Sequence, residues 1–468
     1  MTTIRYKKRG NKWYVYELNQ YWDKDLKKPR QRSKYLGVSD TEGGSYSKIG
    51  ISLKPRLENA ILDYGDSFAI NEICKSIGLS DIIKDSFGDL DSIMSLLCFQ
   101  IIEGSAMYNC EDWREGNIAN KLFPLAKVKS QDITKMFKHL GRQDLQTRFF
   151  KNYVQKFFPG ETGLLIDSTA LPSAINSGIN AFGYSGGNIE RNVTCLMLVD
   201  KKSKLPIYFR SIGGDISDIS TLKTTVAEIK KLGLNADTAI LDAGFCSKEN
   251  LQFMCAEGID FITRLPKSHK AFNDLTAQAG RMEVISNAIK YGDRVVFVKS
   301  KKVKLYDNEI YAHIILDPSK RGKDTNIILK DRVGDEISKD DKKELDKKMK
   351  TAGFFILLSR KKVERSSILP SYYDRQSIEQ VFGFAKNNNN ILPLRVHNEQ
   401  SIRGYLMLVF LALIAFITMR QRLQKPMDKA LLSLRNLKAK VFDNEIISQE
   451  LNKKNKDIFK ALNIIMPT

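Results

Sequence analysis

Residues 372–386 of this 468-residue chain read Tyr-Tyr-Asp-Arg-Gln-Ser-Ile-Glu-Gln-Val-Phe-Gly-Phe-Ala-Lys. Apolar residues recur there at three- and four-residue spacing, which predicts a helix with one buried face formed by Ile378, Val381 and Phe382. Arg375, Glu379 and Lys386 lie at offsets of four and seven residues on an adjacent side. The stretch therefore predicts either one carboxylate between two cations at the edge of a core, or an ordinary amphipathic helix with a surface ion pair.

Two further carboxylates follow apolar stretches that we expect to be buried strands. Leu164–Ile166 leads into Asp167, and Thr238–Leu241 leads into Asp242. Polar ligand sites form at the ends of strands in α/β sheets, and a buried carboxylate needs a cation or a hydrogen-bond donor. Between residues 163 and 265 the order is strand, strand, strand, helix, strand, helix, strand. This order predicts a mixed α/β sheet with the two aspartates in its core.

The chain divides into six predicted segments, and the predicted fold class is α/β. The α/β core is interrupted by a β-rich insertion, preceded by a β-plus-helical region and followed by a helical tail. In order, the segments are a basic aromatic β-unit with a linker, a helical region, the first part of the core, the insertion, the second part of the core, and the tail. Their bounds are 1–50, 51–160, 161–265, 266–352, 353–424 and 425–468.

The composition points to a polyanionic partner in a reducing compartment. Lysine and arginine total 75 against 54 acids, a net charge of +21, which suits nucleic acid or an anionic membrane surface. Six cysteines without a CxxC pair and four scattered histidines argue against a zinc finger. Residues 1–10 lack the apolar core of a signal peptide. The uncharged stretch 405–419 is short for a membrane span, so we expect a buried helix.

The first 160 residues suggest binding to nucleic acid. Residues 1–37 hold eleven Lys or Arg against three acids, among many aromatic residues, and 12–18 and 31–38 are predicted to pair as strands. Such a unit suits phosphates and bases, and a solvated basic hairpin is an equal alternative. The short helices expected between residues 67 and 157 fit a helix-turn-helix reader or a plain helical bundle.

Three convergent acids in a basic protein favour hard divalent cations. Asp167, Asp242 and Glu379 would bind two Mg²⁺ ions, or Mn²⁺ as a substitute, for in-line phosphodiester chemistry. Phosphates beside the metals would be held by Arg375 and Lys386, and Tyr372 would contact a phosphate or a base. Arg191 is a further candidate for the DNA backbone. The stretch Gly183–Gly187 lacks the Gly-Lys-Ser/Thr ending of a nucleotide-binding loop, so no nucleotide cofactor is predicted.

The pattern resembles bacterial insertion-sequence transposases of the DDE class, in the branch with the Y-R-E-K signature. That signature is Tyr, two residues, Arg, three residues, Glu, six residues, Lys, and it is met by Tyr372, Arg375, Glu379 and Lys386. Four more stretches resemble the branch in the expected order: Asp167–Thr169, Phe182–Ser185 with Arg191, Gly214–Asp218, and Asp242–Phe245 with Asn250. Together the resemblance covers about residues 160–420.

The resemblance implies a retroviral-integrase-like (RNase H-like) core with a β-strand insertion before the glutamate. It also implies that the N-terminal region binds DNA ends and that the protein works as a homodimer on paired ends. The predicted function is a cytoplasmic, nucleoid-associated bacterial DNA transposase that binds terminal inverted repeats, cleaves the 3′ strand and joins it to target DNA. The alternatives are a metal-dependent nuclease without strand transfer, a catalytically silent DNA-binding repressor, and, more remotely, a peripheral membrane protein.

Overall fold

The computed structural model describes residues 2–23, 27–46, 60–173, 178–185, 188–216, 218–330, 339–385, 396, 398–423, 425–442 and 445–467. The chain divides into two compact units. The first comprises Met1–Leu62, Lys438–Glu450 and Thr468, and the second comprises Asp63–Leu437 and Leu451–Pro467. The three acids predicted to bind metal all lie in the second unit.

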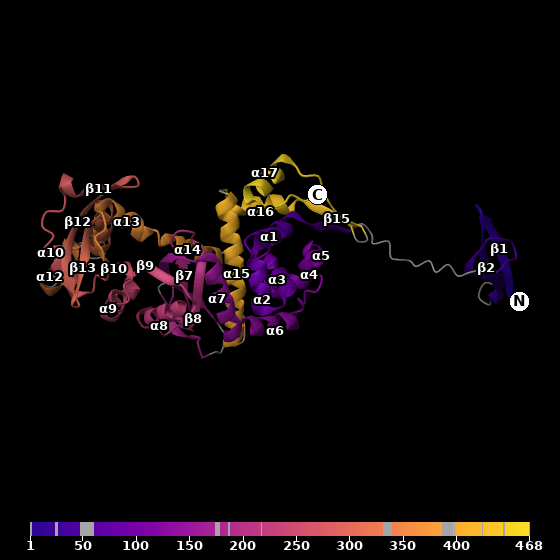
Figure 1. Cartoon of the computed structure of the whole chain (residues 1–468), viewed down its shortest axis with the longest axis horizontal. Helices are drawn as coiled ribbons and strands as arrows, with labels where there is room; N and C mark the ends of the chain where they lie inside the picture. Colours follow the sequence, from indigo (N-terminus) through magenta and orange to yellow (C-terminus); the bar gives the residue numbers. More distant parts are fainter. Residues whose placement is uncertain are drawn as a thin grey trace. The chain divides into compact units, whose positions relative to one another are not determined.

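An antiparallel sheet near the N-terminus has the order β1-β2-β3, with β1 (Thr2–Arg9), β2 (Lys12–Asp23) and β3 (Lys28–Ser39) (Figure 1). The predicted pairing of residues 12–18 with residues 31–38 is confirmed. Alternate side chains of the long strand β2 point to opposite faces of this sheet. The sheet therefore presents two faces of different composition.

The C-terminal tail, residues 425–468, was predicted to be helical, and that prediction is wrong in its middle part. Helices α16 (Met427–Arg435) and α17 (Lys453–Leu462) flank two strands in the chain, β15 (Lys438–Phe442) and β16 (Glu445–Ser448). The strands form a sheet of order β16-β15-β4, with β4 at Ala60–Asp63. Burial alternates along β15, as a strand with one covered face requires.

The second unit begins with helices, as the apolar periodicity predicted. They are α1 (Gly65–Ser76), α2 (Leu79–Phe87), α3 (Leu90–Ile102), α4 (Cys110–Glu115), α5 (Ala119–Leu122), α6 (Ser130–Leu140) and α7 (Gln143–Phe157), with a 3₁₀ turn at Met107–Asn109. Helix α2 contacts α7, and α1 contacts α2 and α3. These helices form one bundle.

Ten of the described strands form a mixed sheet. Its order is β11-β12-β13-β14-β10-β9-β5-β7-β6, and β8 also pairs with β7. The strands are β5 (Glu161–Pro172), β6 (Ala181–Ser185), β7 (Asn188–Asp200), β8 (Pro206–Gly213), β9 (Asn235–Leu241), β10 (Asp260–Leu265), β11 (Ala288–Tyr291), β12 (Arg294–Leu305), β13 (Asn308–Leu316) and β14 (Phe354–Ser359). The pairs β5–β9 and β9–β10 are parallel, and the others are antiparallel. The mixed α/β class predicted from the sequence is confirmed.

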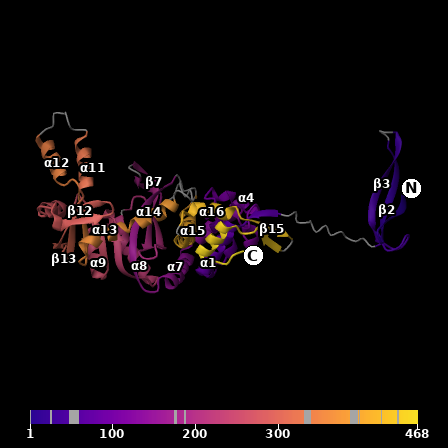
Figure 2. The ribbon, with the colours of Figure 1, turned by 90° about the horizontal axis from the view of Figure 1, so that it is seen from above.

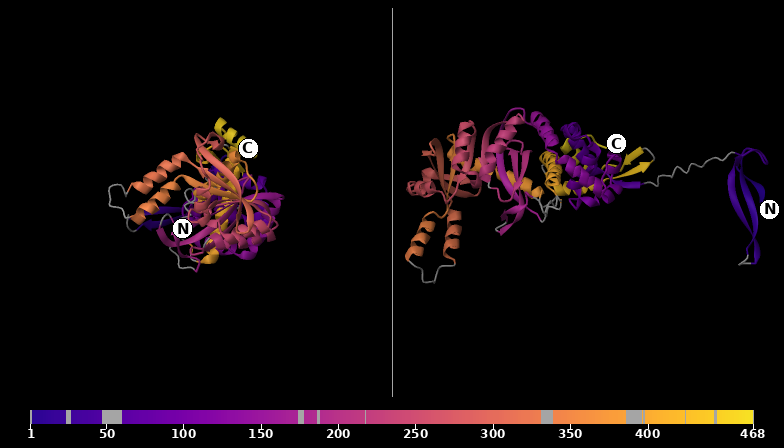
Figure 3. Two further views of the ribbon diagram at one scale, coloured as in Figure 1. Left: turned by 90° about the vertical axis from the view of Figure 1, so that its left-hand side faces the viewer. Right: turned by 90° about the horizontal axis from the view of Figure 1, so that it is seen from below.

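The strands are connected by helices. These are α8 (Asp218–Lys231), α9 (Lys248–Ala256), α10 (Lys270–Ala277), α11 (Pro318–Leu329) and α12 (Lys339–Lys350), with 3₁₀ turns at Ala243–Phe245 and Ile285–Asn287. Helices α11 and α12 lie side by side and stand away from the sheet (Figures 2 and 3). The segment 266–352, predicted to be β-rich, therefore combines three strands of the main sheet with three helices.

Helix α15 (Glu399–Leu423) lies at the centre of the second unit. It contacts the bundle through α3 and α6 and the sheet through β8 (Figure 1). A close approach at Gly404 allows this packing, because a Cβ there would lie 1.8 Å from the Phe137 carbonyl oxygen. By length and composition α15 could cross a membrane, but 83% of its most apolar window is buried inside the protein. It is a core helix, as expected for residues 405–419.

The stretch 372–386 was predicted to be one helix, and the structure divides it into α13 (Arg365–Tyr373) and α14 (Gln376–Gly383). At the junction the Arg375 amide donates to the Tyr372 carbonyl and the Ser377 amide to the Asp374 carbonyl. These bonds span three residues instead of four and tighten the turn. The predicted apolar stripe is confirmed, since Ile378, Val381 and Phe382 are buried.

Candidate active site

Asp167 and Asp242 are brought together by the register of two parallel strands. Ile166 of β5 is paired with Leu241 of β9, so the next residue of each strand is one of the two aspartates. The Ser168 amide donates to Asp167 Oδ1 at 3.0 Å. Asp242 follows the end of β9 as predicted, whereas Asp167 lies inside β5, which continues to Pro172 along β7. The two carboxylates therefore occupy neighbouring positions where the pairing of β5 with β9 ends.

The guanidinium of Arg375 lies among all three predicted acids. Its Nη1 is 2.7 Å from Asp167 Oδ2, and its Nη2 is 3.6 Å from Asp242 Oδ1 and 3.5 Å from Glu379 Oε1. The side chains of Arg375 and Asp167 are 15% and 13% exposed, whereas those of Asp242 and Glu379 are 43% and 55% exposed. The cluster thus has a largely covered ion pair, Arg375–Asp167, with two more exposed carboxylates around it.

The turn between α13 and α14 directs Arg375 toward the acids. Tyr373 stacks on Tyr291 of β11 with ring centroids 5.5 Å apart. Lys204 Nζ, from the turn between β7 and β8, donates to Asp374 Oδ1 at 3.2 Å. Tyr373, Asp374 and Arg375 are therefore each in contact with a different part of the sheet, namely β11, the β7–β8 turn and β5. These contacts coincide with the point where the regular helix is interrupted.

Burial and charge shift the pKa values of the cluster in definite directions. Burial raises the pKa of Asp167 to about 6; Arg375 opposes this rise, and Asp242 adds to it. Burial by itself would lower the pKa of Arg375, but the carboxylates, Asp167 first, outweigh it and raise the pKa. Burial also raises the pKa of Tyr372 well above its usual range, with Asp242 contributing. Arg375 therefore stays charged, and Tyr372 stays neutral.

The other residues that were predicted to contact DNA differ in how exposed they are. Tyr372 is 4% exposed, and its hydroxyl donates to Asp242 Oδ1 at 3.2 Å. Arg191 of β7 is exposed, and its guanidinium carbon lies 5.1 Å from the ring centroid of Phe182. Lys386 lies outside the described residues. In this state Tyr372 and Arg375 contact the acids, and Arg191 faces solvent.

The acids have the right chemistry for the predicted cations. Three carboxylates supply the hard oxygen ligands that Mg²⁺ and Mn²⁺ prefer. They converge on one positive charge, the guanidinium of Arg375, which stands in for a cation at this position. In the described part of the chain, no group of three or more His, Cys, Asp or Glu side chains is arranged to hold a metal ion directly. The three carboxylates thus have the chemistry of metal ligands, and in this arrangement they are paired with Arg375.

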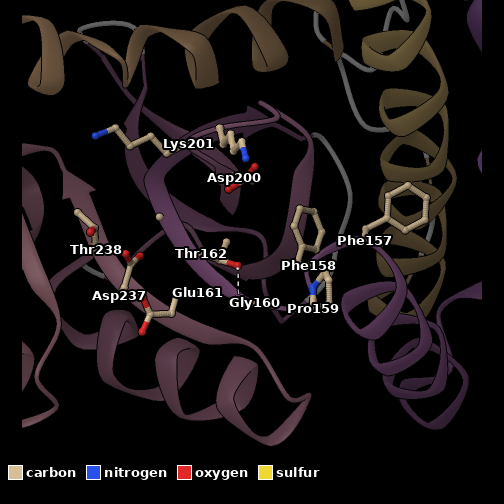
Figure 4. A pocket seen from close by; sticks show the side chains of 12 residues that line it. Phe157, Phe158, Pro159, Gly160, Glu161, Thr162, Asp200, Lys201, Asp237 and Thr238 are labelled. Carbon is tan, nitrogen blue, oxygen red and sulfur yellow. Dashed lines mark hydrogen bonds between the residues drawn. The ribbon is translucent and has the colours of Figure 1, made fainter.

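A pocket of about 510 Å³ lies elsewhere on the same sheet (Figure 4). It is lined by the start of β5, including Glu161 and Thr162, and by Asp200, Lys201 and Asp237. Thr162 Oγ1 donates to the Gly160 carbonyl inside it at 3.2 Å. The pocket adjoins the first residues of β5 and β9, whereas the acids lie toward their carboxyl ends. It is therefore separate from the acidic cluster.

Two contributors to the cluster were not predicted. Lys204 holds Asp374, and the Thr263 hydroxyl of β10 donates to the Asp242 carbonyl at 3.1 Å. Neither belongs to a recognisable motif, because each acts through a distant partner in the chain. The ion pair of Arg375 with Glu379 was predicted from their four-residue spacing and is confirmed. The contacts of Arg375 with Asp167 and Asp242 were not predicted, because these residues are distant from Arg375 in the chain.

Comparison with known proteins identifies the family. The family model described as "Transposase DDE domain" matches residues 158–415, more than half of the chain. The chain therefore belongs to this transposase family. A search of curated proteins finds no match.

Solved structures also include a similar chain. It is a piggyBac transposase in a synaptic complex with hairpin DNA, at 10% sequence identity and a TM-score of 0.41. The alignment covers 85% of this chain and 76% of that chain. A TM-score this low supports no further argument, so the family assignment rests on the match to residues 158–415.

Proposed function

We propose that this protein is a DNA transposase that binds terminal inverted repeats, cleaves the 3′ strand and joins it to target DNA. The observation that carries the proposal is the convergence of Asp167, Asp242 and Glu379 around one cationic position. Membership of the transposase family supports DNA as the substrate. The net charge of +21 suits a polyanion.

The three carboxylates serve as the ligands of two divalent metal ions, Mg²⁺ or Mn²⁺. Bound there, the metals would lower the pKa of an attacking water or 3′-hydroxyl and stabilise the leaving oxygen. Strand pairing fixes Asp167 and Asp242, and α14 supplies Glu379 from the side. A fixed donor set of this kind favours in-line attack, because it positions the reacting groups before reaction.

The basic and aromatic signature residues contact DNA in this proposal. Arg375 leaves the acids and binds a phosphate beside them, and Lys386, Tyr372 and Arg191 contact the same strand or its neighbour. The residue spacing of Tyr372, Arg375, Glu379 and Lys386 supports placement in the Y-R-E-K branch of bacterial insertion-sequence transposases.

The finer architecture belongs to the same proposal. The sheet order β8-β7-β5-β9-β10, with β5, β9 and β10 parallel, supports an RNase H-like core. The segment 266–352 is its insertion, the N-terminal region binds DNA ends, and a homodimer holds two ends together. The protein acts in the bacterial cytoplasm at the nucleoid.

A cleavage assay tests the function. Purified protein is mixed with labelled duplexes carrying the inverted repeats that flank its own gene, in Mg²⁺, Mn²⁺ or EDTA. We expect metal-dependent nicking at the repeat boundary. Glu379→Gln should lower the rate more than about 100-fold, because even partners of metal ligands are worth 10–100-fold. The matched control is Glu364→Gln, an exposed residue before α13 outside the cluster.

The products separate the alternatives. Nicked ends that also join to a second duplex support the transposase, and nicked ends that never join support a nuclease. Binding to the repeats without cleavage in any metal supports a catalytically silent repressor. Normal cleavage by Glu379→Gln would refute the assignment of the three acids.

A further inference from the structure

The β1-β2-β3 sheet has two faces with different charge. Pairing places Arg5 opposite Tyr16, Lys7 opposite Tyr14, and Arg9 opposite Lys12. Because side chains alternate along a strand, all these residues share one face, which also includes Tyr35, paired with Tyr16. We call this surface the tyrosine face, and its defining residues are Arg5, Lys7, Arg9, Lys12, Tyr14, Tyr16 and Tyr35.

The opposite, mixed face contains acids beside its cations. Its charged residues are Lys8, Glu17, Asp23, Lys28, Arg30, Arg32 and Lys34. Arg30 Nε lies 3.5 Å from Asp23 Oδ2, and Lys34 is paired across the strands with Glu17. Part of this face is also covered, since the Tyr6 hydroxyl donates to the Gly44 carbonyl at 3.0 Å and Val15 is fully buried.

The tyrosine face is cationic and exposed. Arg5, Lys7, Arg9 and Lys12 are all exposed, and within the described strands this face carries no acidic side chain. The rings of Tyr16 and Tyr35 are 5.4 Å apart, and the Arg9 guanidinium carbon lies 6.0 Å from the Tyr14 ring centroid. Packed rings hold the sheet surface in shape, and the exposed cations beside them are accessible to an external anion.

We propose that the tyrosine face binds the phosphate backbone of duplex DNA, as a contact surface separate from the acidic cluster. Cations on alternate residues of β1 repeat about every 7 Å, so several phosphates are reached at once. Sheets and ribbons of this size enter DNA grooves. The tyrosines supply apolar contact with sugars. The choice of DNA over another polyanion rests on the proposed transposase function, and binding through phosphates is independent of sequence.

The two faces provide a matched experiment in the full-length protein. One variant carries Arg5→Ala, Lys7→Ala, Arg9→Ala and Lys12→Ala. The other carries Lys28→Ala, Arg30→Ala, Arg32→Ala and Lys34→Ala, and it loses the same charge from the mixed face. Binding to a labelled duplex without repeat sequences is measured by fluorescence anisotropy from about 50 to 200 mM salt.

We expect the tyrosine-face variant to lose at least tenfold in affinity, and its log–log salt slope to shrink by roughly 3–4, since each phosphate contact contributes about 0.9. The mixed-face variant should change by much less. Equal losses in both variants, or no loss in either, would overturn the proposal. So would a tyrosine-face variant that binds DNA normally but no longer binds phosphatidylserine vesicles, because the partner would then be a membrane.

Separate control measurements test the folding of the variants and the proposed transposase function. Trp13 and Trp22 lie in β2, and the third tryptophan, Trp113, lies in α4. In a Trp113→Phe background, fluorescence therefore reports whether the sheet survives in each variant. If a quadruple variant unfolds, Lys7→Glu is compared with Arg32→Glu, and only the first should weaken binding. Metal-dependent cleavage by the wild-type protein tests the proposed transposase function. Failure of cleavage refutes that function, whereas equal DNA binding by the two face variants refutes only this assignment.

Discussion

Replacing Arg375 with an uncharged residue should destabilise the metal-free protein. Arg375→Met keeps the length of the side chain and removes its charge. The Arg375–Asp167 pair is short, at 2.7 Å, with both side chains largely buried, and breaking a buried pair from one side costs about 3–5 kcal/mol. The contacts with Asp242 and Glu379 are longer and partly exposed, so each adds at most about 1 kcal/mol.

Protonation of Asp167 offsets part of this loss. Burial has already raised its pKa to about 6, and removal of the neighbouring cation raises the pKa further, so the carboxyl becomes neutral near pH 7. A neutral carboxyl costs less to bury than a carboxylate. The net expectation is about 2–4 kcal/mol, which lowers the melting temperature by several degrees.

Thermal melting in EDTA measures the effect. Glu379→Gln is the control, since it removes only an ion pair to a carboxylate that is 55% exposed. Added Mg²⁺ should stabilise Arg375→Met more than the wild type, because the metal supplies the missing charge without displacing a guanidinium. If Arg375→Met melts at the wild-type temperature in EDTA, Arg375 does not hold the acids together and the reasoning fails.

Two further predictions concern the sheet. Gly183→Ala should lower the free energy of unfolding by about 1–3 kcal/mol, because the added Cβ would lie 2.1 Å from the Gly214 carbonyl oxygen. Gly160→Ala is the control, since open space surrounds that position. Equal melting temperatures for the two variants would contradict this prediction. His313 is buried and bonded to two serines, and burial lowers its pKa from 6.5 to about 4. The contribution of neutral His313 to the free energy of unfolding is fully present above about pH 6.5 and is lost as the pH falls toward 4. Between pH 7 and pH 5 the wild type should therefore lose about 2 kcal/mol more of its free energy of unfolding than His313→Gln does. Identical pH profiles of the two proteins would argue that His313 has the same pKa in the folded and unfolded states.

The sheet and its acids were predictable because local patterns specify them. Leu164–Ile166 is continuously apolar, as in a strand covered on both faces, and Asp167 follows it within β5. The equivalent stretch before Asp242 has the same form. Parallel pairing of these two strands then brings the acids together without any further information.

The unpredicted features depend on partners distant in the chain. At the break between α13 and α14, Asp374 contacts Lys204 and Tyr373 contacts Tyr291, and no local pattern connects these partners to the stretch. Similarly, β15 forms in the tail because β4 pairs with it from the other end of the chain. Propensity alone favoured a helix in both places, and tertiary contacts overrode it.

The position of Arg375 is consistent with two roles for this residue in the proposed function, one with the acids and one with DNA. Three acids surround one cation in the cluster, and Arg375 reduces their mutual repulsion. Its Nε is buried and, among the described residues, has no hydrogen-bond partner, so this pairing is incomplete. Two divalent ions at the acids would bring four positive charges, which repel the guanidinium instead of requiring it. If metals and DNA bind as proposed, a phosphate beside the metals would offer Arg375 a bidentate partner, and its charge would then be available to hold the substrate.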